Sequence, residues 1–369
     1  MNQSSLTTRL GEYISLVLPA AHGHQRKAVT DFVRALITVQ TCCQATLARC
    51  FDNFESASKR LSRLLHNARR APDDLALSHA RASAAQLPAE GAVRLALDWT
   101  TEDSRHLLVA SLRVGRRAVP RYWRAYDSAE LKARMSRYQR EFLRALFDDL
   151  LRGVERRRFV LTADRWFADV DLLDLLDELG GSYVIRTKSS YKVRVEGRWR
   201  KLDSLGWQGN QRRRAWGRVG YCEGDPRRVY LTQARARDAK GKWGVWHLLS
   251  NRPLSGVGAS REYARRFTCE EGFRDGKRLL GFSEARIKCV EAWARMFLLV
   301  ALARSVLTRM GCALLGRADR AALLRRVRSR RRARSELSLV RSVVELLSQE
   351  ESWWQLLDHR TSLDLEAGL

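Results

Sequence analysis

Hydrophobic and polar positions repeat with two different periods along the chain, and the change of period separates its parts. Residues 1–88 follow a helical period and carry few strand signals. From residue 89 the period becomes two, which predicts a first strand over 93–98. The same pattern predicts further strands over 107–114, 119–126, 158–163 and 183–187.

Two helices are predicted between these strands. A long amphipathic helix should begin after the Asp127-Ser128 cap and end near Gly153. A shorter helix, rich in leucine and aspartate, is closed by Gly180-Gly181. Three strands joined by hairpins, then helix, strand, helix and strand, predict an α/β fold with a mixed sheet and helices packed on it. This order matches the ribonuclease H-like fold.

Two aspartates should meet in this arrangement. Asp98 lies in the first predicted strand, and Asp164 directly follows the fourth. Because these two strands are neighbours in a ribonuclease H-like sheet, we expect the carboxylates to lie side by side, although 66 positions separate them in the sequence.

The rest of the chain divides into three further parts. Residues 188–251 combine glycines, short alternating runs and five of the eleven tryptophans, which predicts a small antiparallel β insertion. Helical periodicity returns after Ser260, so that 252–315 completes the domain begun by 89–187. Residues 316–369 form a basic helical C-terminal region, in which an arginine-dense run at 325–334 precedes an acidic, tryptophan-containing helix.

The N-terminal helical region, 1–88, contains a candidate helix-turn-helix. Asp52-Asn53 marks a tight turn, and a second helix is expected over 55–66. This helix should bury its leucines and present three basic side chains outward: Lys59, Arg60 and Arg63. Such a pair can lay its second helix in the major groove of DNA. A solvated helical hairpin explains the same pattern equally well.

The charge balance narrows the possible partners. Lysine and arginine total 68 against 41 aspartate and glutamate residues, which gives a formal net charge of +27. The basic residues are spread over several segments, which favours nucleic acid over an anionic membrane surface or a merely basic protein.

Cysteines and apolar runs indicate a soluble intracellular protein. Seven cysteines, an odd number with no Cys-x-x-Cys, favour reduced thiols over a disulfide framework or a zinc cluster. Arg9 and Glu12 interrupt any early apolar run, so no signal peptide is expected. The apolar stretch 296–303 is shorter than the ~20 residues that span a bilayer, and it predicts a buried helix.

Four polar residues share one predicted helix face: Tyr263, Arg266, Glu270 and Lys277. Their offsets of 3, 7 and 14 place them in a narrow stripe at about 100° per residue. An ion-paired solvated face accounts for the stripe equally well, because Arg266 and Glu270 form an i,i+4 pair. Catalysis at a phosphodiester explains why the stripe would occur together with the two aspartates, Asp98 and Asp164. Three carboxylates can hold two magnesium ions, and cationic groups then clamp phosphates.

These segments resemble one family of enzymes. The run from Tyr263 to Lys277 is similar to the Tyr-(2)-Arg-(3)-Glu-(6)-Lys signature of bacterial insertion-sequence DDE transposases of family four. Leu97-Asp98-Trp99-Thr100 resembles that family's first-aspartate strand. Residues 162–167 together with 183–186 resemble its second-aspartate region. The similarity spans most of residues 90–313.

The resemblance implies a chemistry and a set of roles. Asp98, Asp164 and Glu270 would bind two Mg²⁺ ions, with Mn²⁺ as a substitute, and cut transposon ends before the 3′-OH attacks target DNA. Tyr263, Arg266 and Lys277 would contact DNA phosphates, and Trp246 or Trp243 of the insertion would stack on a flipped base. The partners would be double-stranded DNA, with its terminal inverted repeats and target, and a second subunit in a DNA-assembled homodimer. The location would be the bacterial cytoplasm, at the nucleoid, without membrane attachment.

Two other functions remain open from the sequence, and a third has little support. A nuclease on the same fold would cut DNA without joining it, and the carboxylates alone do not separate the two. A decayed transposase kept as a repressor would bind DNA without catalysis, but none of the three acids is missing. A nucleotide-binding enzyme would rest on Gly256-Val-Gly258 alone, without a complete phosphate loop.

Overall fold

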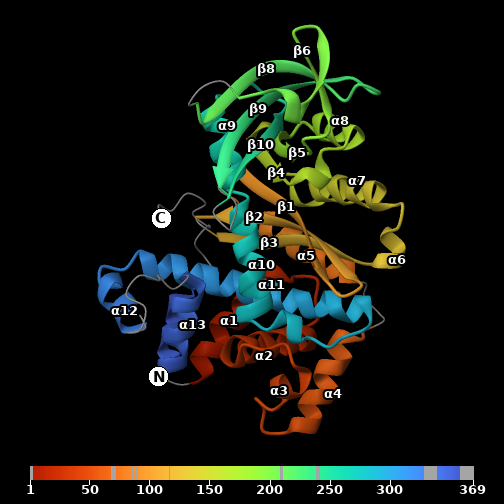
Figure 1. The fold of residues 1–369 in the computed structure, drawn as a ribbon. Helices are drawn as coiled ribbons and strands as arrows, with labels where there is room; N and C mark the ends of the chain where they lie inside the picture. The colour runs from red at the N-terminus through yellow and green to blue at the C-terminus, as the bar shows by residue number, and fades with distance from the viewer. Residues whose placement is uncertain are drawn as a thin grey trace.

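A computed structural model describes residues 3–67, 72–84, 87, 90–115, 117–207, 211–237, 242–327 and 339–357. Part of the arginine-dense run, residues 328–334, and the last residues of the C-terminal region lie outside these ranges. Figure 1 shows the central sheet above a layer of helices formed by both ends of the chain.

The strands form one ten-stranded sheet in the order β3-β2-β1-β4-β5-β10-β9-β8-β6-β7. Their bounds are β1 (Val93–Glu102), β2 (Arg105–Val114), β3 (Arg117–Asp127), β4 (Phe159–Ala163), β5 (Ser182–Thr187), β6 (Lys192–Val195), β7 (Arg198–Lys201), β8 (Arg213–Tyr221), β9 (Arg227–Arg237) and β10 (Trp243–Ser250). The first five are the five predicted strands. β1 runs parallel to β4 and pairs Leu97 with Ala163, which confirms that the strands bearing the two aspartates are neighbours.

The five strands within 188–251 are antiparallel to their neighbours and extend the central sheet. β10 pairs with β5, with His247 opposite Thr187, so the sheet is continuous across the whole α/β part of the chain. The predicted antiparallel strands are present, but they share a sheet with β1–β5.

The helices surround this sheet. Those before and within its first half are α1 (Gln3–Val17), α2 (Gly23–Val39), α3 (Gln44–Ala48), α4 (Phe54–Leu65), α5 (Pro72–Ala84), α6 (Ser128–Leu131), α7 (Met135–Ala145), the π-helical η1 (Leu146–Leu150), the 3₁₀ turns η2 (Arg156–Arg158) and η3 (Arg165–Phe167), and α8 (Val170–Glu178). The later ones are the 3₁₀ turn η4 (Leu202–Ser204), α9 (Gly256–Ala264), α10 (Phe267–Arg274), the π-helical η5 (Asp275–Leu279), the 3₁₀ turn η6 (Phe282–Glu284), α11 (Val290–Leu315), α12 (Arg320–Val327), α13 (Leu339–Gln349) and the 3₁₀ turn η7 (Glu351–Leu356).

The long helix expected after residue 128 is broken. Asp127 caps its start as predicted, accepting the backbone N–H of Ala129 at 2.9 Å. The backbone then leaves the helical region at Lys132 and takes a positive φ of 60° at Ala133. These two residues end the first turn, and a separate helix, α7, starts at Met135. The amphipathic pattern could not show this break, because neither residue is a glycine or proline.

The predicted helical hairpin near the N-terminus is present as α3 and α4. Asn53 caps α4 by accepting the backbone N–H of Ser56 at 2.8 Å. Lys59 and Arg63 are exposed on this helix, as expected. The outward placement of Arg60 is wrong: its guanidinium lies 3.2 Å from Asp31 and over the rings of two phenylalanines, so it ties α4 to α2.

Helix α11 lies between β3 and the N-terminal helices (Figure 1). Its residues are almost all buried, which confirms the buried helix predicted at 296–303. Among the described residues it is the one helix long and apolar enough to cross a membrane, and 83% of its most apolar window lies inside the protein.

Burial also makes stability depend on pH through His79 of α5. Its imidazole is 0% exposed, and burial followed by the charge of Arg121 lowers its pKa from 6.5 to about 3. The unfolded chain therefore takes up a proton below pH 6.5 that the folded chain does not. The free energy of unfolding should fall by up to about 1.4 kcal/mol per pH unit as the pH drops from 6.5 towards 3.

Urea denaturation of wild type and His79→Gln between pH 5 and 8 tests this. The variant should show a flatter decline below pH 6.5. His66→Gln, at an exposed position of the N-terminal region, is the matched control and should keep the wild-type slope. Identical slopes in wild type and His79→Gln would contradict the assignment.

Candidate active site

Asp98 lies on the face of β1 that α10 covers. Its carboxylate accepts the backbone N–H of Trp99 at 3.0 Å and a guanidinium N–H of Arg266 at 2.7 Å. Burial is the largest cause of a rise in its pKa from 3.8 to about 6. Asp164 and Glu270 add to this rise, whereas Arg266 opposes it. The three candidate carboxylates therefore act on one another electrostatically.

Asp164 directly follows β4, and the parallel pairing of Leu97 with Ala163 brings it beside Asp98, which lies near the middle of β1. Its side chain is half-buried and accepts the backbone N–H of Trp166 at 3.0 Å. This bond makes Asp164 the cap of η3 and fixes the direction of the chain after the strand.

Arg266 bridges two of the three acids. One Nη donates to Asp98 at 2.7 Å and the other to Glu270 at 2.5 Å. The guanidinium is 7% exposed and lies 5.7 Å from the ring centre of Tyr263 and 5.4 Å from that of Phe267. Burial by itself would lower the pKa of Arg266, but Tyr263 and the carboxylates together raise it above its ordinary value. Arg266 is therefore a firmly charged counter-ion.

The neighbouring glutamates of α10 have different partners. Glu270 meets Arg266, whereas Glu271 accepts from Arg117 of β3 at 2.6 Å. Only Glu270 shares the electrostatic environment of Asp98. The glutamate of the predicted stripe, and not its neighbour, thus contacts the arginine that binds Asp98.

The stripe is not carried by one continuous helix, as the pattern predicted. α9 ends at Ala264 and α10 begins at Phe267. Between them the backbone forms tighter i to i−3 hydrogen bonds, including Arg266 N–H to the carbonyl of Tyr263 at 2.9 Å. Tyr263 and Glu270 still lie on either side of Arg266, because the interruption is a single turn.

Lys277 falls in the π-helical η5 and lies towards the far end of β1. Its ammonium donates to the carbonyl of Thr101 at 2.6 Å and lies 3.0 Å from Glu102. It is therefore paired with Glu102 and has no observed contact with the three candidate ligands. Glu102, which is close to Asp98 in the sequence, therefore has Lys277 as its ion-pair partner.

The remaining predicted DNA contacts lie in two places. Trp246 of β10 is half-buried, and its ring centre is 5.0 Å from that of Tyr263 and 5.6 Å from that of Phe267. It thus adjoins the stripe. Helix α4, with Lys59 and Arg63, lies at the end of the molecule remote from β4 and β5 (Figure 1).

A second ion pair beside the site was not expected from the sequence. Arg94 of β1 donates to Glu262 of α9 at 2.9 Å, and both side chains are largely buried. Arg94 and Asp98 are four residues apart on the strand, and Glu262 and Arg266 are four apart across the helical turn. The strand has its positive charge first and the helical segment has its negative charge first, so both ion pairs form when the two elements lie side by side in this position. The one sign of this pair in the sequence was that Arg94, like Asp98, is a charged residue in a strand that is otherwise mostly apolar.

Close packing lets α10 approach the strand face. Ala96, two residues before Asp98, packs with Ala118 and Cys269. Gly272 lies so close to β3 that an added Cβ would be 3.0 Å from the carbonyl of Ala118 and would collide with the guanidinium of Arg304. Small side chains at these positions therefore bring Glu270 within reach of the group that holds Asp98.

The donor set suits a hard divalent cation, since all three groups offer carboxylate oxygens. In the part of the chain that the structure describes, however, no group of three or more His, Cys, Asp or Glu residues is arranged to hold a metal ion. The guanidinium of Arg266 lies between Asp98 and Glu270. A cation shared by these two acids would have to replace it.

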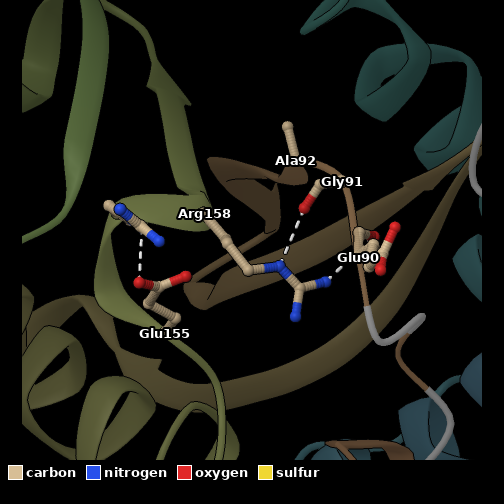
Figure 2. A pocket seen from close by; sticks show the side chains of 6 residues that line it. Glu90, Gly91, Ala92, Glu155 and Arg158 are labelled. Carbon is tan, nitrogen blue, oxygen red and sulfur yellow. Dashed lines mark hydrogen bonds and ion pairs between the residues drawn. The ribbon is translucent and has the colours of Figure 1, made fainter.

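A surface groove of about 420 Å³ lies at the opposite edge of the sheet (Figure 2). It is lined by residues that precede β1 and β4. Arg158 donates to the carbonyls of Gly91 at 2.9 Å and Glu90 at 3.1 Å. Its guanidinium thus joins the segment before β1 to the start of β4, at the opposite end of β4 from Asp164.

Comparison with known families relates part of the chain to transposases. Residues 143–306 match the family model described as "Transposase DDE domain". The matched segment is shorter than half of the chain, contains Asp164 and Glu270, and begins after Asp98. The match supports a transposase-type function with DNA as substrate and suggests an enzyme that cleaves nucleic acid. The mixed sheet is consistent with a DDE, ribonuclease H-like domain. No curated protein matches the chain.

The close approach at Gly272 can be tested by adding one methyl group. Gly272→Ala should lower the free energy of unfolding by about 1–3 kcal/mol, the usual cost of overpacking a close contact. Gly153→Ala is the control, because nothing lies within 4 Å of its added Cβ. Equal stability of the two variants in chemical denaturation would show that α10 does not need this contact.

Proposed function

We propose that the chain is a DDE transposase that cleaves DNA at the ends of a transposon and joins the freed 3′-OH to target DNA. One observation carries the proposal: Asp98 lies on β1 next to the end of the paired strand β4, which Asp164 directly follows, and Arg266 joins Asp98 to Glu270 of α10. The family match over two of these residues supports it.

Asp98, Asp164 and Glu270 would hold two Mg²⁺ ions, for which Mn²⁺ can substitute. Such ions stabilise the attacking and leaving oxygens of an in-line displacement at phosphorus. Arg266 would then leave the carboxylates and donate to a DNA phosphate, for which its planar fork of N–H groups is suited. The released Lys277 would contact a neighbouring phosphate of the transposon end. Tyr263 is 1% exposed beneath Trp246 and Arg266, so it would have to become exposed when Arg266 moves in order to contact another.

DNA would also be bound outside the candidate active site. Lys59 and Arg63 are the exposed cations of α4 that can reach a major groove, and Arg60 is excluded because it holds α4 to α2. Trp246 would stack on a flipped base from the β10 side of Tyr263. Terminal inverted repeats and target DNA would be held by a homodimer that forms on DNA. The site of action would be the bacterial cytoplasm, at the nucleoid.

Cleavage of the element's own DNA ends in Mg²⁺ tests the three acids. Asp98→Asn, Asp164→Asn and Glu270→Gln should each reduce the cleavage rate by at least about 100-fold, as expected for loss of a group that stabilises transition-state charge. Glu271→Gln is the matched control on the same helix turn and should cleave at the wild-type rate. Wild-type cleavage by any of the three acid variants would remove that residue from the proposal.

A joining assay separates a transposase from a nuclease on the same fold. A pre-cut end with a free 3′-OH should become covalently attached to target DNA in the presence of wild-type protein and Mg²⁺. Cleavage of ends without any joining would identify a nuclease. Binding without either reaction would identify a repressor.

A further inference from the structure

An exposed tryptophan lies beside the candidate active site. Within the described ranges, Trp166 is the most exposed large hydrophobic side chain, at 55%. Its backbone N–H donates to Asp164 at 3.0 Å, and the next side chain, Phe167, is fully buried. The backbone of η3 is therefore anchored on both sides of Trp166, two residues from Asp164, while more than half of Trp166 is exposed.

A lysine from the adjacent strand accompanies this indole. Lys188 directly follows β5, and its ammonium nitrogen lies 4.5 Å from the ring centre of Trp166. β4 and β5 are parallel, with Ala163 opposite Ile185, so both residues lie just beyond the carboxyl ends of neighbouring strands. Asp164 lies at this same edge of the sheet, directly after β4.

We propose that Trp166 and Lys188 form a nucleotide-binding platform for an unpaired base of DNA next to the scissile phosphate. The indole would stack on the base, and Lys188 would pair with a phosphate of the same strand. This inference rests on the proposed function, because it assumes that DNA strands separate beside Asp164.

The surroundings favour a nucleotide over an apolar ligand or a protein partner. Arg165 is exposed beside Trp166, and the chain carries a net charge of +27. Aromatic faces bordered by cations suit single-stranded nucleic acid, because every base offers a π-face and every nucleotide a negative charge. The platform is distinct from Trp246, whose ring already packs against Tyr263 and Phe267.

Binding to end DNA with unpaired nucleotides flanking the cleavage point tests the platform. Affinities are measured with Ca²⁺ in place of Mg²⁺, so that the DNA is not cut. Trp166→Ala should weaken binding by about five- to 150-fold, the range for loss of one base–aromatic stack, and Trp166→Phe should retain most of the affinity. An abasic nucleotide at the stacked position should weaken wild type equally and should not weaken Trp166→Ala further.

Lys188 supplies an independent readout. Lys188→Ala should reduce the slope of log Kd against log salt by about 0.7, as for one phosphate contact on a single strand. Trp166→Ala should leave this slope unchanged.

Trp243→Ala is the matched comparison, because Trp243 is 51% exposed and has Arg237 over its ring at 4.8 Å. If Trp243→Ala removes the sensitivity to the abasic position and Trp166→Ala does not, the proposal is overturned. Equal binding by wild type and Trp166→Ala also overturns it. If wild type neither cleaves nor joins DNA ends in Mg²⁺, the proposed function fails instead, so the two failures are distinguishable.

Discussion

The guanidinium of Arg266, held between the carboxylates of Asp98 and Glu270, is the contact on which the candidate site depends. Asp98 is largely buried, and burial is the largest cause of the rise in its pKa, to which repulsion by Asp164 and by the more exposed Glu270 adds. Arg266 offsets this with hydrogen bonds of 2.7 and 2.5 Å. The chain thus supplies its own positive charge at the place where the proposed chemistry needs a cation.

The fold brings these charges together by close packing and by charge order. Ala96 and Gly272 leave room for α10 against the sheet. The pairs Arg94–Glu262 and Asp98–Arg266 then fix how the helical segment lies along β1, since a shift would bring like charges together. Beyond the strand ends, Asp164 caps a short turn that also carries Trp166. The same edge of the sheet therefore gathers acids that attract cations and an aromatic surface that suits a base.

Much of the sheet could be predicted from the sequence, because hydrophobic and polar residues alternate along a strand and this alternation is visible in a short segment. The pairing of β1 with β4 followed from the order of elements. The break at Ala133 could not be predicted, since a positive φ at alanine has no compositional signal. The turn between α9 and α10 could not be predicted either, because the residues on both sides of it keep the spacing of one continuous helix.

For the candidate site, the sequence could predict that the strands next to Asp98 and Asp164 are neighbours, but it could not predict what these side chains contact. The spacing of Arg266 and Glu270 indicated their ion pair. The bond from Arg266 to Asp98 spans 168 residues of sequence, so no local pattern reveals it. Lys277 illustrates the same limit: its position was predicted as part of a stripe, but its partner is Glu102 at the end of another element. Arg60 was misplaced because its partners lie on a different helix.

In the proposed site Arg266 occupies the place of a divalent cation, and Mn²⁺ binding to the DNA-free protein tests this most directly. Titration followed by electron paramagnetic resonance should show that Arg266→Ala binds Mn²⁺ at least about tenfold more tightly than wild type, a difference of roughly 1.4 kcal/mol. Adding Asp98→Asn to Arg266→Ala should remove the gain. If Arg266→Ala binds Mn²⁺ no better than wild type, or if the double variant binds as tightly as the single one, the acids do not form the cation site described.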